Sequence, residues 1–550
     1  MKNIFTVIVG GKAGEGVKKL AQLIAKTALE HGLHCFQSDD YQSLIKGGHN
    51  FSTVSISEDP IHNAYKYADL IICLDQLSYT KHLPELKVGG NIYYNRDEAV
   101  NDIGIGLPLT SLMKESYQNP ANLSLAGLAI FFAHLGLNQE EMHSLIKRSY
   151  KKQIEENLIF ADKCFPLVQP QTSLPASLVS REPSKLFTGN QAISLGAWLT
   201  GLDMYFAYPM TPASSILHYL ASMSAKLGVK AIHAESELAA ANMAVGAVVG
   251  GARAAIGSSG GGFALMQEAF SMAGITEAPL LCILSSRPGP ATGVSTYTAQ
   301  EDLYFALHQG HGEFDRIVAS PDCIERAFSL AGELLALAWE LQIPTILLTE
   351  KHLSESMQDI TLPTNQIPQA NPLSPQVTEG YKRYQFTEDG ISPMLFPPSE
   401  EVIKWNSHEH LESGLRTDQA EAIVAMKDKR QRKPVTAACS KYQAYAIYGE
   451  GNKRIFAYGS TALEVREALK YLDGDYQLVV PIYLEPLPIE QLLPYCTEPA
   501  IVIEHNSKPR FAQFLKEKLG LTSRADILRY DGRAWDPIEL ADRIKEVDNA

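Results

Sequence analysis

The sequence predicts a multidomain α/β protein built from parallel-sheet domains. Short apolar runs alternate with longer helical patterns along most of its 550 residues. Between residues 189 and 350 this alternation is continuous, which predicts a parallel sheet covered by helices. In the stretch from Tyr208 to Gln300, three Gly- or Pro-rich loops each follow an apolar run. We expect these loops to meet at one end of the sheet, where open α/β sheets bind their ligands.

Length and composition exclude several classes of protein. A chain of this length is too long for one core, and roughly three or four domains are expected. Hydrophobic residues make up 45% and charged residues 20%, as in ordinary globular proteins. No run of about 18 apolar residues is present, so we expect no membrane span. The net charge of −14 argues against a nucleic-acid-binding surface and is attributed to solubility.

The seven cysteines are scattered, and no two of them form a Cys-x-x-Cys pair. This spacing predicts no metal site in this chain, neither zinc nor a local iron–sulfur motif. An odd number of cysteines also disfavours a disulfide framework, so a reducing, cytoplasmic compartment is expected. The apolar N-terminus meets a glycine-rich turn at once and lacks a small-residue cleavage site, so it is interpreted as a strand rather than a signal peptide.

An α/β domain is predicted for residues 1–165. A strand over residues 3–10 leads into the turn Gly10–Gly16 and a helix from Val17 to about His31. Such a turn can hold a phosphate or carboxylate on backbone N–H groups, or its glycines can serve packing alone; the spacing leaves both interpretations open. Further buried strands are expected at 51–56 and 68–74, and helices between 122 and 165. Residues 166–186 have linker composition.

A second domain is predicted for residues 187–355. After a helix at 189–200 and a strand at 204–208, two prolines end the strand and leave the Thr211 hydroxyl exposed. Residues 238–255 are crowded with Ala and Gly, which predicts a helix in close contact with other backbone. Glu235 and Glu237 lie at its start, where the helix dipole favours anions, and position alone favours that role for both.

The remainder of this domain contains an arginine suited to binding carboxylates. A helix at 263–273 and a strand at 279–284 lead to Arg287, which shares a Pro/Gly-rich loop with Thr292 and Thr296. A guanidinium among hydroxyl groups suits a small carboxylate, although an ordinary surface arginine is an equally open interpretation. The elements that follow are expected at 302–307, 314–318, 323–342 and 344–348.

The C-terminal part is predicted to contain a crossing segment, residues 356–435, and an α/β domain, residues 436–550. The crossing segment ends in a basic cluster, Lys427–Lys433. Nucleic-acid binding is one interpretation of this cluster, but a solvated helix end or a subunit contact is favoured on an acidic chain. In the last domain, strands are expected at 454–458, 477–481 and 500–504 and helices at 462–472 and 488–495. Glu504-His505-Asn506 ends the last strand without an identified partner.

Several motifs, in the same order along the chain, resemble the α subunit of 2-oxoacid:ferredoxin oxidoreductases with the family's γ-type domain fused at its N-terminus. The motifs are Gly10–Gly16, Ile45-Lys46-Gly47-Gly48, Tyr208-Pro209-Met210-Thr211-Pro212, Glu235-Ser236-Glu237, Leu265-Met266-Gln267-Glu268, Gly289-Pro290-Ala291-Thr292-Gly293, Gly390-Ile391-Ser392-Pro393 and His408-Glu409-His410. The resemblance implies a γ-type domain over 1–165, a transketolase-like pyrimidine-binding domain over 187–355 and a transketolase C-terminal-like domain over 436–550.

The same resemblance implies oxidative decarboxylation of a 2-oxoacid to an acyl-CoA, with thiamine diphosphate as cofactor and coenzyme A as co-substrate. Glu237 matches the catalytic glutamate that hydrogen-bonds the cofactor's aminopyrimidine, whereas Glu235 keeps its helix-end interpretation. Tyr208 and Pro209 would contact the cofactor. Thr211, Arg287, Thr292 and Thr296 would bind the substrate.

The family divides these functions between chains, so a β subunit is expected to carry Mg²⁺ and a [4Fe–4S] cluster and to pass electrons to ferredoxin. We expect an (αβ)₂ assembly and an inactive isolated chain. The two-subunit layout favours 2-oxoglutarate; pyruvate, branched-chain and aryl 2-oxoacids remain alternatives. A non-catalytic assembly or regulatory subunit and a non-redox thiamine enzyme of transketolase type are the other hypotheses.

Three departures from the family pattern stand out. Lys46 replaces the usual Arg, Gly261-Gly262 replaces the usual Gly-Pro, and Ser507–Arg510 follows Glu504-His505-Asn506 where a Gly-Gln pair is common. None of them removes a catalytic group. The last is expected to alter the subunit interface or the coenzyme A region.

Overall fold

The computed structural model describes residues 4–42, 48–117, 122–175, 184–371 and 380–548. The chain forms two compact units. Unit 1 comprises residues 1–187 and 356–361, and unit 2 comprises residues 188–355 and 362–550. Lys46 and most of the motif around it lie outside the described residues.

Unit 1 contains an eight-stranded mixed sheet with the order β6-β5-β4-β1-β3-β2-β14-β7. Strands β1, β4, β5 and β6 run parallel, whereas β3 is antiparallel to both β1 and β2. The strands are β1 (Ile4–Lys12), β2 (His34–Asp40), β3 (His49–Ser57), β4 (Ala68–Cys73), β5 (Leu86–Asn95), β6 (Ile105–Leu107), β7 (Lys185–Thr188) and β14 (Met357–Ile360).

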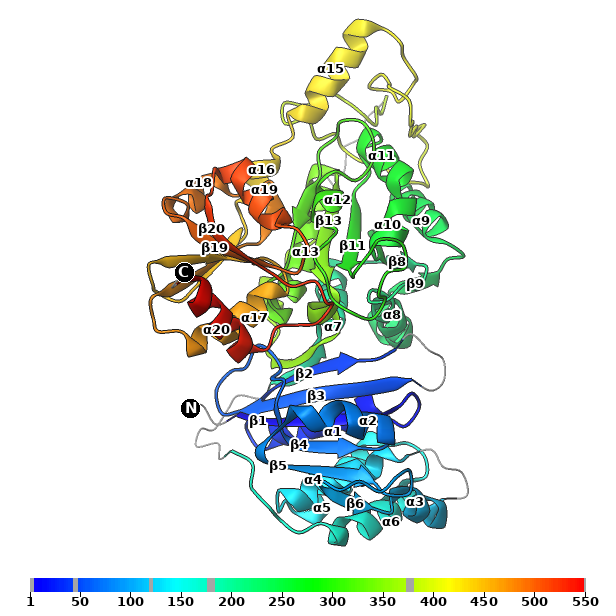
Figure 1. Cartoon of the computed structure of the whole chain (residues 1–550). Helices are drawn as coiled ribbons and strands as arrows, with labels where there is room; N and C mark the ends of the chain where they lie inside the picture. The colour runs from blue at the N-terminus through cyan, green and yellow to red at the C-terminus, as the bar shows by residue number, and fades with distance from the viewer. Residues whose placement is uncertain (1–3, 43–47, 118–121, 176–183, 372–379, 549–550) are drawn as a thin grey trace. The chain divides into compact units, whose positions relative to one another are not determined.

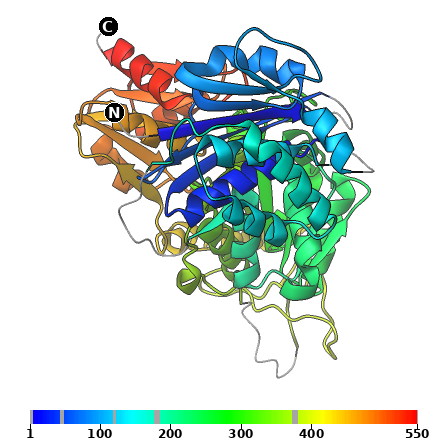
Figure 2. The same cartoon turned by 90° about the horizontal axis from the view of Figure 1, so that it is seen from below.

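Successive residues of a strand point to opposite faces of a sheet, and in this sheet both faces carry apolar side chains. Helices cover these faces and shield them from water. Val7, Val9 and Leu70 face the larger core, to which α1 and α4 also contribute buried residues. Figure 2 shows α1 in dark blue together with the strands of this sheet. Ile8 and Ile71 face a smaller core that includes Tyr79 of α2. The helices are α1 (Val17–Glu30), α2 (Gln76–His82), α3 (Leu109–Ser116), α4 (Ser124–His134), α5 (Gln139–Ser149) and α6 (Ile154–Cys164), with 3₁₀ turns η1 (Leu83–Glu85) and η2 (Phe165–Leu167).

The turn between β1 and α1 supports the packing interpretation of its glycines. The Lys12 N–H donates to the carboxylate of Glu15 over 2.7 Å, so the loop already contains an anion of its own. A Cβ on Gly16 would lie 2.5 Å from Ser124 Oγ, and one on Gly10 would lie 2.6 Å from Ser78 Cβ. These glycines therefore allow close approach of neighbouring helices.

Unit 2 begins with a seven-stranded sheet of order β18-β12-β13-β11-β10-β8-β9. All neighbouring strands are parallel except the edge strand β18, as the alternating pattern predicted. The strands are β8 (Met204–Ala207), β9 (Lys230–His233), β10 (Ala254–Ser258), β11 (Leu280–Ser286), β12 (Ile317–Ala319), β13 (Pro344–Glu350) and β18 (Tyr483–Glu485).

Two helix predictions in this region were wrong in their extent. The small-residue helix ends at Val249, and Ala254 and Ala255 belong to strand β10. The predicted helix over 263–273 is two helices that meet at Met266. The helices are α7 (Gly189–Thr200), α8 (Ser214–Leu227), α9 (Glu237–Val249), α10 (Gly260–Leu265), α11 (Gln267–Ile275), α12 (Leu303–Leu307), α13 (Ile324–Leu341) and α14 (Lys351–Glu355).

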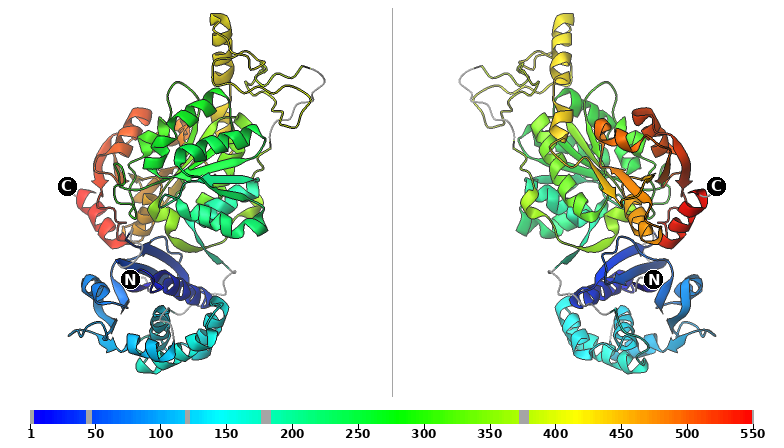
Figure 3. Two further views of the ribbon diagram at one scale, coloured as in Figure 1. Left: turned by 90° about the vertical axis from the view of Figure 1, so that its right-hand side faces the viewer. Right: turned by 90° about the vertical axis from the view of Figure 1, so that its left-hand side faces the viewer.

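A five-stranded sheet of order β15-β17-β16-β19-β20 completes unit 2, and Figure 3 shows it, in orange, beside the seven-stranded sheet of the same unit, in green. Its strands are β15 (Tyr445–Tyr448), β16 (Lys453–Phe456), β17 (Tyr476–Pro481), β19 (Ala500–Glu504) and β20 (Ser523–Leu528). The helices are α16 (Val435–Cys439), α17 (Thr461–Ala468), α18 (Ile489–Leu492), α19 (Arg510–Leu519) and α20 (Pro537–Asp548), with 3₁₀ turns η4 (Leu469–Tyr471) and η5 (Leu493–Tyr495).

The segment between the two sheets of unit 2 is mostly irregular, and α15 (Ala420–Gln431) projects from it (Figure 1). It also contains the 3₁₀ turn η3 (Thr364–Gln366). The favoured prediction of a solvated helix end was wrong for two members of the basic cluster. Lys429 and Lys433 are buried, and both contact the carboxylate of Glu277. Burial of a lysine requires such a partner, which local sequence does not reveal.

Candidate functional site

Three neighbouring parallel strands, β8, β10 and β11, place the predicted loops side by side. Met204 of β8 is in register with Ala254 of β10, and Ala255 is in register with Leu281 of β11. Since the strands run in the same direction, the loops after Ala207, Ser258 and Ser286 leave the same edge of the sheet.

Glu237 occupies the first turn of α9 and is buried, with 4% of its surface exposed. The Ser236 side chain caps the helix by accepting from the Ala239 N–H over 3.2 Å. Glu237 Oε1 has no hydrogen-bond partner among the described residues. The carboxyl group therefore lies in a desolvated position with an unsatisfied acceptor, which is unusual in folded proteins.

The glycine loop after β10 packs directly on Glu237. A Cβ on Gly262 would lie 2.6 Å from Glu237 Oε1 and would collide with Ser258 Oγ. Ser258 in turn lies 3.9 Å from the sulfur of Met210, in the loop after β8. Glycine at position 262 thus allows the loop backbone to approach the carboxyl group closely.

Arg287 joins the loop after β11 to the loop after β8. Its Nη1 donates to the Thr211 carbonyl oxygen over 2.8 Å. Arg287 is half-buried, and this contact holds one arm of its guanidinium towards the loop after β8. The structure thus brings together the loops that carry Thr211 and Arg287 and the glycine loop that packs on Glu237.

Asp302 lies at the same site, although the sequence indicated only a helix start at this position. Its Oδ2 accepts from Ser286 Oγ over 2.5 Å, and a Cβ on Gly260 would lie 2.6 Å from its Oδ1. Burial raises the pKa of Asp302 to about 6, with the Ser286 hydrogen bond opposing the shift. The carboxyl group holds the end of β11 against the glycine loop.

Two regions of the chain match known families. Residues 195–429 match the thiamine diphosphate-binding domain of pyruvate flavodoxin/ferredoxin oxidoreductases, and residues 6–165 match pyruvate ferredoxin/flavodoxin oxidoreductase. A 2-oxoacid:ferredoxin oxidoreductase subunit alpha from Saccharolobus solfataricus is 28% identical over 98% of this chain and 97% of that protein. The chain belongs to the 2-oxoacid:ferredoxin oxidoreductase family.

Further relatives agree with this membership. A structure of 2-oxoglutarate:ferredoxin oxidoreductase from Magnetococcus marinus, with 2-oxoglutarate, coenzyme A and succinyl-CoA bound, covers 100% of both chains with 26% identity and a TM-score of 0.89. A 2-oxoglutarate synthase subunit KorA from Archaeoglobus fulgidus is 31% identical over 40% of this chain and 65% of that protein. The predicted family and α/β fold class are confirmed.

The remaining predicted site residues differ in their exposure. Thr296 is buried and Pro209 half-buried, whereas Thr292 is exposed. Tyr208 is 41% exposed, with its ring edge-on to His233 at 6.2 Å between centroids. The structure describes no hydrogen bond that joins these four residues to Glu237. Glu235 is exposed, in keeping with its helix-end interpretation.

Two of the three departures from the family pattern, Gly261-Gly262 and Ser507–Arg510, lie among the described residues, and both include exposed residues. Gly261 is exposed, and the nearest atom to a Cβ built on it would be the Ala291 carbonyl oxygen at 3.7 Å. Ser507, Lys508 and Pro509 form an exposed turn before α19, which begins at Arg510.

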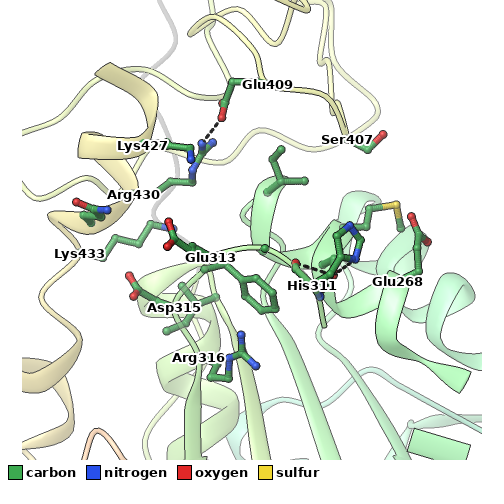
Figure 4. Close-up of a pocket in the computed structure, with 18 residues that line it drawn as sticks. Glu268, His311, Glu313, Asp315, Arg316, Ser407, Glu409, Lys427, Arg430 and Lys433 are labelled. Carbon is green, nitrogen blue, oxygen red and sulfur yellow. Dashed lines mark hydrogen bonds and ion pairs between the residues drawn. The ribbon is translucent and has the colours of Figure 1, made fainter. Parts of the chain in front are cut away.

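A separate pocket of about 600 Å³ lies between α11, the loop 311–316 and the end of α15 (Figure 4). Its charged residues are of both signs, and Arg430 is paired with Glu409 over 2.7 Å. His311 contacts Ser271 through Nδ1 at 2.9 Å. None of the predicted substrate or cofactor residues lines this pocket.

The polar constellation that ends β19 has partners in the structure. His505 Nε2 lies 2.7 Å from a carboxylate oxygen of Glu464, and Glu504 accepts from the Phe511 N–H at the start of α19.

Across the part of the chain that the structure describes, no helix is long and apolar enough to cross a membrane. That same part contains no group of three His, Cys, Asp or Glu side chains arranged to hold a metal ion.

Proposed function

We propose that this chain is the α subunit, with its γ-type domain fused, of an enzyme that oxidatively decarboxylates a 2-oxoacid, with 2-oxoglutarate favoured. The products are the acyl-CoA and CO₂, and the electrons pass to ferredoxin through a partner subunit's [4Fe–4S] cluster. The observation that carries the proposal is the buried, unpaired Oε1 of Glu237 beside the glycine loop.

The residues around Glu237 fit the aminopyrimidine of thiamine diphosphate. A buried acceptor without a hydrogen bond destabilises the protein by about 1–3 kcal/mol. A ligand that donates a hydrogen bond to Oε1 would remove this penalty. The neighbouring positions are glycines, so the backbone can lie against a flat ring. Thiamine diphosphate supplies a carbon centre that stabilises the carbanion formed on decarboxylation. Glu237 would hold a proton between its Oε1 and a ring nitrogen, with Tyr208 and Pro209 at the cofactor's edge.

Arg287 is proposed to bind the carboxylate of the 2-oxoacid. A guanidinium carries five N–H donors in a planar fork that matches a carboxylate. The Thr211 carbonyl orients this fork, and the hydroxyls of Thr211, Thr292 and Thr296 supply further donors around the substrate. In a water-poor site such fixed donors orient the anion and stabilise developing charge.

The partner subunit is proposed to be a β subunit that carries Mg²⁺ and the cluster, in a cytoplasmic (αβ)₂ assembly. This division is supported by the relatives' designation as alpha subunits. Preference for 2-oxoglutarate is supported by the Magnetococcus and Archaeoglobus relatives, whose names specify that substrate.

Activity of the reconstituted complex tests the proposal. The complex with its co-expressed partner is expected to reduce a viologen dye anaerobically with 2-oxoglutarate and coenzyme A, and the isolated chain is expected to be inactive. Glu237→Gln should lower kcat by about 10²–10⁴-fold, the range of a lost proton-transfer group. The exposed neighbour provides a matched control, because Glu235→Gln should keep kcat within about twofold.

The outcomes separate the competing hypotheses. Full activity in Glu237→Gln would contradict the assigned role. A cluster-loaded complex that is silent with 2-oxoglutarate, pyruvate, branched-chain and aryl 2-oxoacids would favour a non-catalytic subunit. Turnover with another 2-oxoacid alone would replace the proposed substrate and leave the reaction class intact.

A further inference from the structure

Gln300 ends the loop that carries Arg287 and Thr296, and it is 1% exposed. Its backbone N–H donates to the His505 carbonyl oxygen over 2.9 Å, and its own carbonyl oxygen accepts from the Tyr458 hydroxyl over 3.2 Å. The backbone at this point is therefore bound on both sides by the C-terminal sheet.

The side-chain amide of Gln300 is also fully hydrogen-bonded. Nε2 donates to Glu350 Oε1 and to the Tyr458 carbonyl oxygen, each over 2.9 Å. Oε1 accepts from Thr461 Oγ1 over 2.9 Å and from the His505 N–H over 3.0 Å. Two donors and two lone pairs complete the hydrogen-bonding capacity of an amide. A reversed amide would face its oxygen towards Glu350 and a carbonyl oxygen, so only one orientation is satisfied.

The partners of Gln300 come from several elements of unit 2. Glu350 is the last residue of β13, Tyr458 follows β16, His505 follows β19, and Thr461 begins α17. The amide thus connects the carboxyl edges of the two sheets of unit 2. Glu350 and Thr461 belong to a strand and a helix, and Tyr458 and His505 lie within two residues of the ends of strands, so regular structure positions all four partners.

The residues on both sides of Gln300 connect it to the proposed site through hydrogen bonds. Before it, the Thr298 N–H donates to the Gly532 carbonyl oxygen over 3.0 Å. After it, Glu301 accepts from the Gly289 N–H over 2.7 Å, and Asp302 accepts from Ser286 Oγ. The start of the loop that carries Arg287 and Thr296 is therefore hydrogen-bonded to the two residues that directly follow Gln300, and the loop ends at Gln300 itself.

We propose that Gln300 is a positioning residue that fixes the loop 287–300 on the C-terminal domain and thereby sets the affinity for the 2-oxoacid. The C-terminal domain then takes part in substrate binding through this amide, although it supplies none of the substrate-binding residues named above. This inference rests on the proposed function, because it assigns the loop's Arg287 and Thr296 to the substrate.

The test compares Gln300→Glu with Gln342→Glu in the complex assembled with the partner subunit. Gln342 is a second buried amide, which accepts from Arg383 Nη1 over 3.0 Å and lies outside the loop. In Gln300→Glu a carboxylate would face Glu350 and the Tyr458 carbonyl, so the amide's donors are lost. We expect KM for the 2-oxoacid to rise at least about tenfold at pH 8, with kcat changed by less than about threefold.

The pH profile separates positioning from a general loss of stability. At pH 6 the new carboxyl group holds a proton more often, because a second buried carboxyl group lies beside it, and it then regains one donor. KM of Gln300→Glu should therefore recover towards wild type as the pH falls, whereas Gln342→Glu should show wild-type KM throughout. A KM within twofold of wild type in folded Gln300→Glu, or an equal rise in Gln342→Glu, would overturn the inference.

Thr461→Val provides a second variant if Gln300→Glu does not fold. It removes one donor to the amide with little change in volume, and we expect KM to rise about three- to fivefold. An unchanged KM in this variant would also overturn the inference. A wild-type complex without 2-oxoacid activity would instead refute the proposed function, so the two failures are distinguishable.

Discussion

Two buried glutamates in unit 2 have opposite surroundings. Glu277 follows α11, is fully buried, and lies 2.6 Å from Lys429 Nζ and 2.8 Å from Lys433 Nζ. Arg383 donates to its backbone carbonyl oxygen over 2.8 Å. Glu237, at the start of α9, is almost as deeply buried, but its Oε1 has no partner in the described part of the chain.

The difference shows what kind of role each carboxyl group has. Burial alone would raise the pKa of Glu277, but Lys433, Lys429 and Arg383 together hold it well below its usual range. Burial likewise lowers the pKa of Lys429 to about 8, with Glu277 opposing the shift. A carboxylate with all its partners present stabilises the fold, whereas one without a partner is available to a ligand.

The largest expected effect is on stability, in Glu277→Gln. The substitution leaves Lys429 and Lys433 buried without a counter-charge, and we expect the free energy of unfolding to fall by about 3–5 kcal/mol. Urea denaturation of unit 2 or of the whole chain measures this change. The exposed pair Glu340–Lys441 provides the control, because Glu340→Gln should cost less than about 1 kcal/mol. Similar losses in both variants would contradict the role assigned to Glu277.

A third buried carboxyl group, Glu350, is hydrogen-bonded to neutral groups rather than to cations, so it is intermediate between Glu277 and Glu237. Its surroundings predict that the stability of the fold depends on pH. Its partners are neutral donors, Gln300 Nε2 and the Ser460 N–H, and burial raises its pKa from 4.5 to about 7. As pH rises from about 4.5 to 7, the unfolded chain loses this proton before the folded one does. Its contribution to stability therefore falls over that window, by up to about 3 kcal/mol.

Comparison of wild type with Glu350→Gln at pH 5 and pH 7.5 measures this contribution. The wild-type chain should lose about 2–3 kcal/mol more of its unfolding free energy between the two pH values than the variant does. Glu277 contributes the opposite slope, because its lowered pKa stabilises the fold above about pH 4.5 and this stabilisation is lost in acid. Equal pH slopes in wild type and Glu350→Gln would show that Glu350 does not titrate in this range.

A smaller effect is expected for the stability of Glu237→Gln. Oε1 has no partner to lose, and a neutral amide is easier to bury than a carboxylate, so the unfolding free energy should change by less than about 1 kcal/mol. The same denaturation experiment measures it beside Glu277→Gln. A loss of several kcal/mol would mean that Glu237 is a structural residue, like Glu277.

The smallest effect is expected where an ion pair is partly exposed. Arg253 contacts Asp203 over 2.9 Å, with side-chain exposures of 30% and 41%. Solvent screening limits such a pair, and Asp203→Asn should cost at most about 1 kcal/mol, with a weaker effect at high salt. A cost equal to that of Glu277→Gln would remove burial as the explanation for the difference.

The sequence alone determined the alternation of strands and helices and the loops at the sheet edge, because hydrophobic periodicity and Gly/Pro punctuation are local signals. It also singled out Glu237, through the motif around it. It could not locate the end of α9, because an Ala- and Gly-rich run continues from the helix into β10 without a change of periodicity. The roles given to Glu237, Thr211, Arg287, Thr292 and Thr296 remain predictions for the experiments above.

Only the tertiary structure decided which charged and polar groups are buried together. Lys429 looked like a surface lysine because its partner Glu277 lies 152 residues earlier. The local sequence offers no reason to single out Gln300, because its partners lie between 50 and 205 residues away. A buried polar group is satisfied by whatever the fold brings within about 3 Å, and that proximity is a property of the packed sheets rather than of the local sequence.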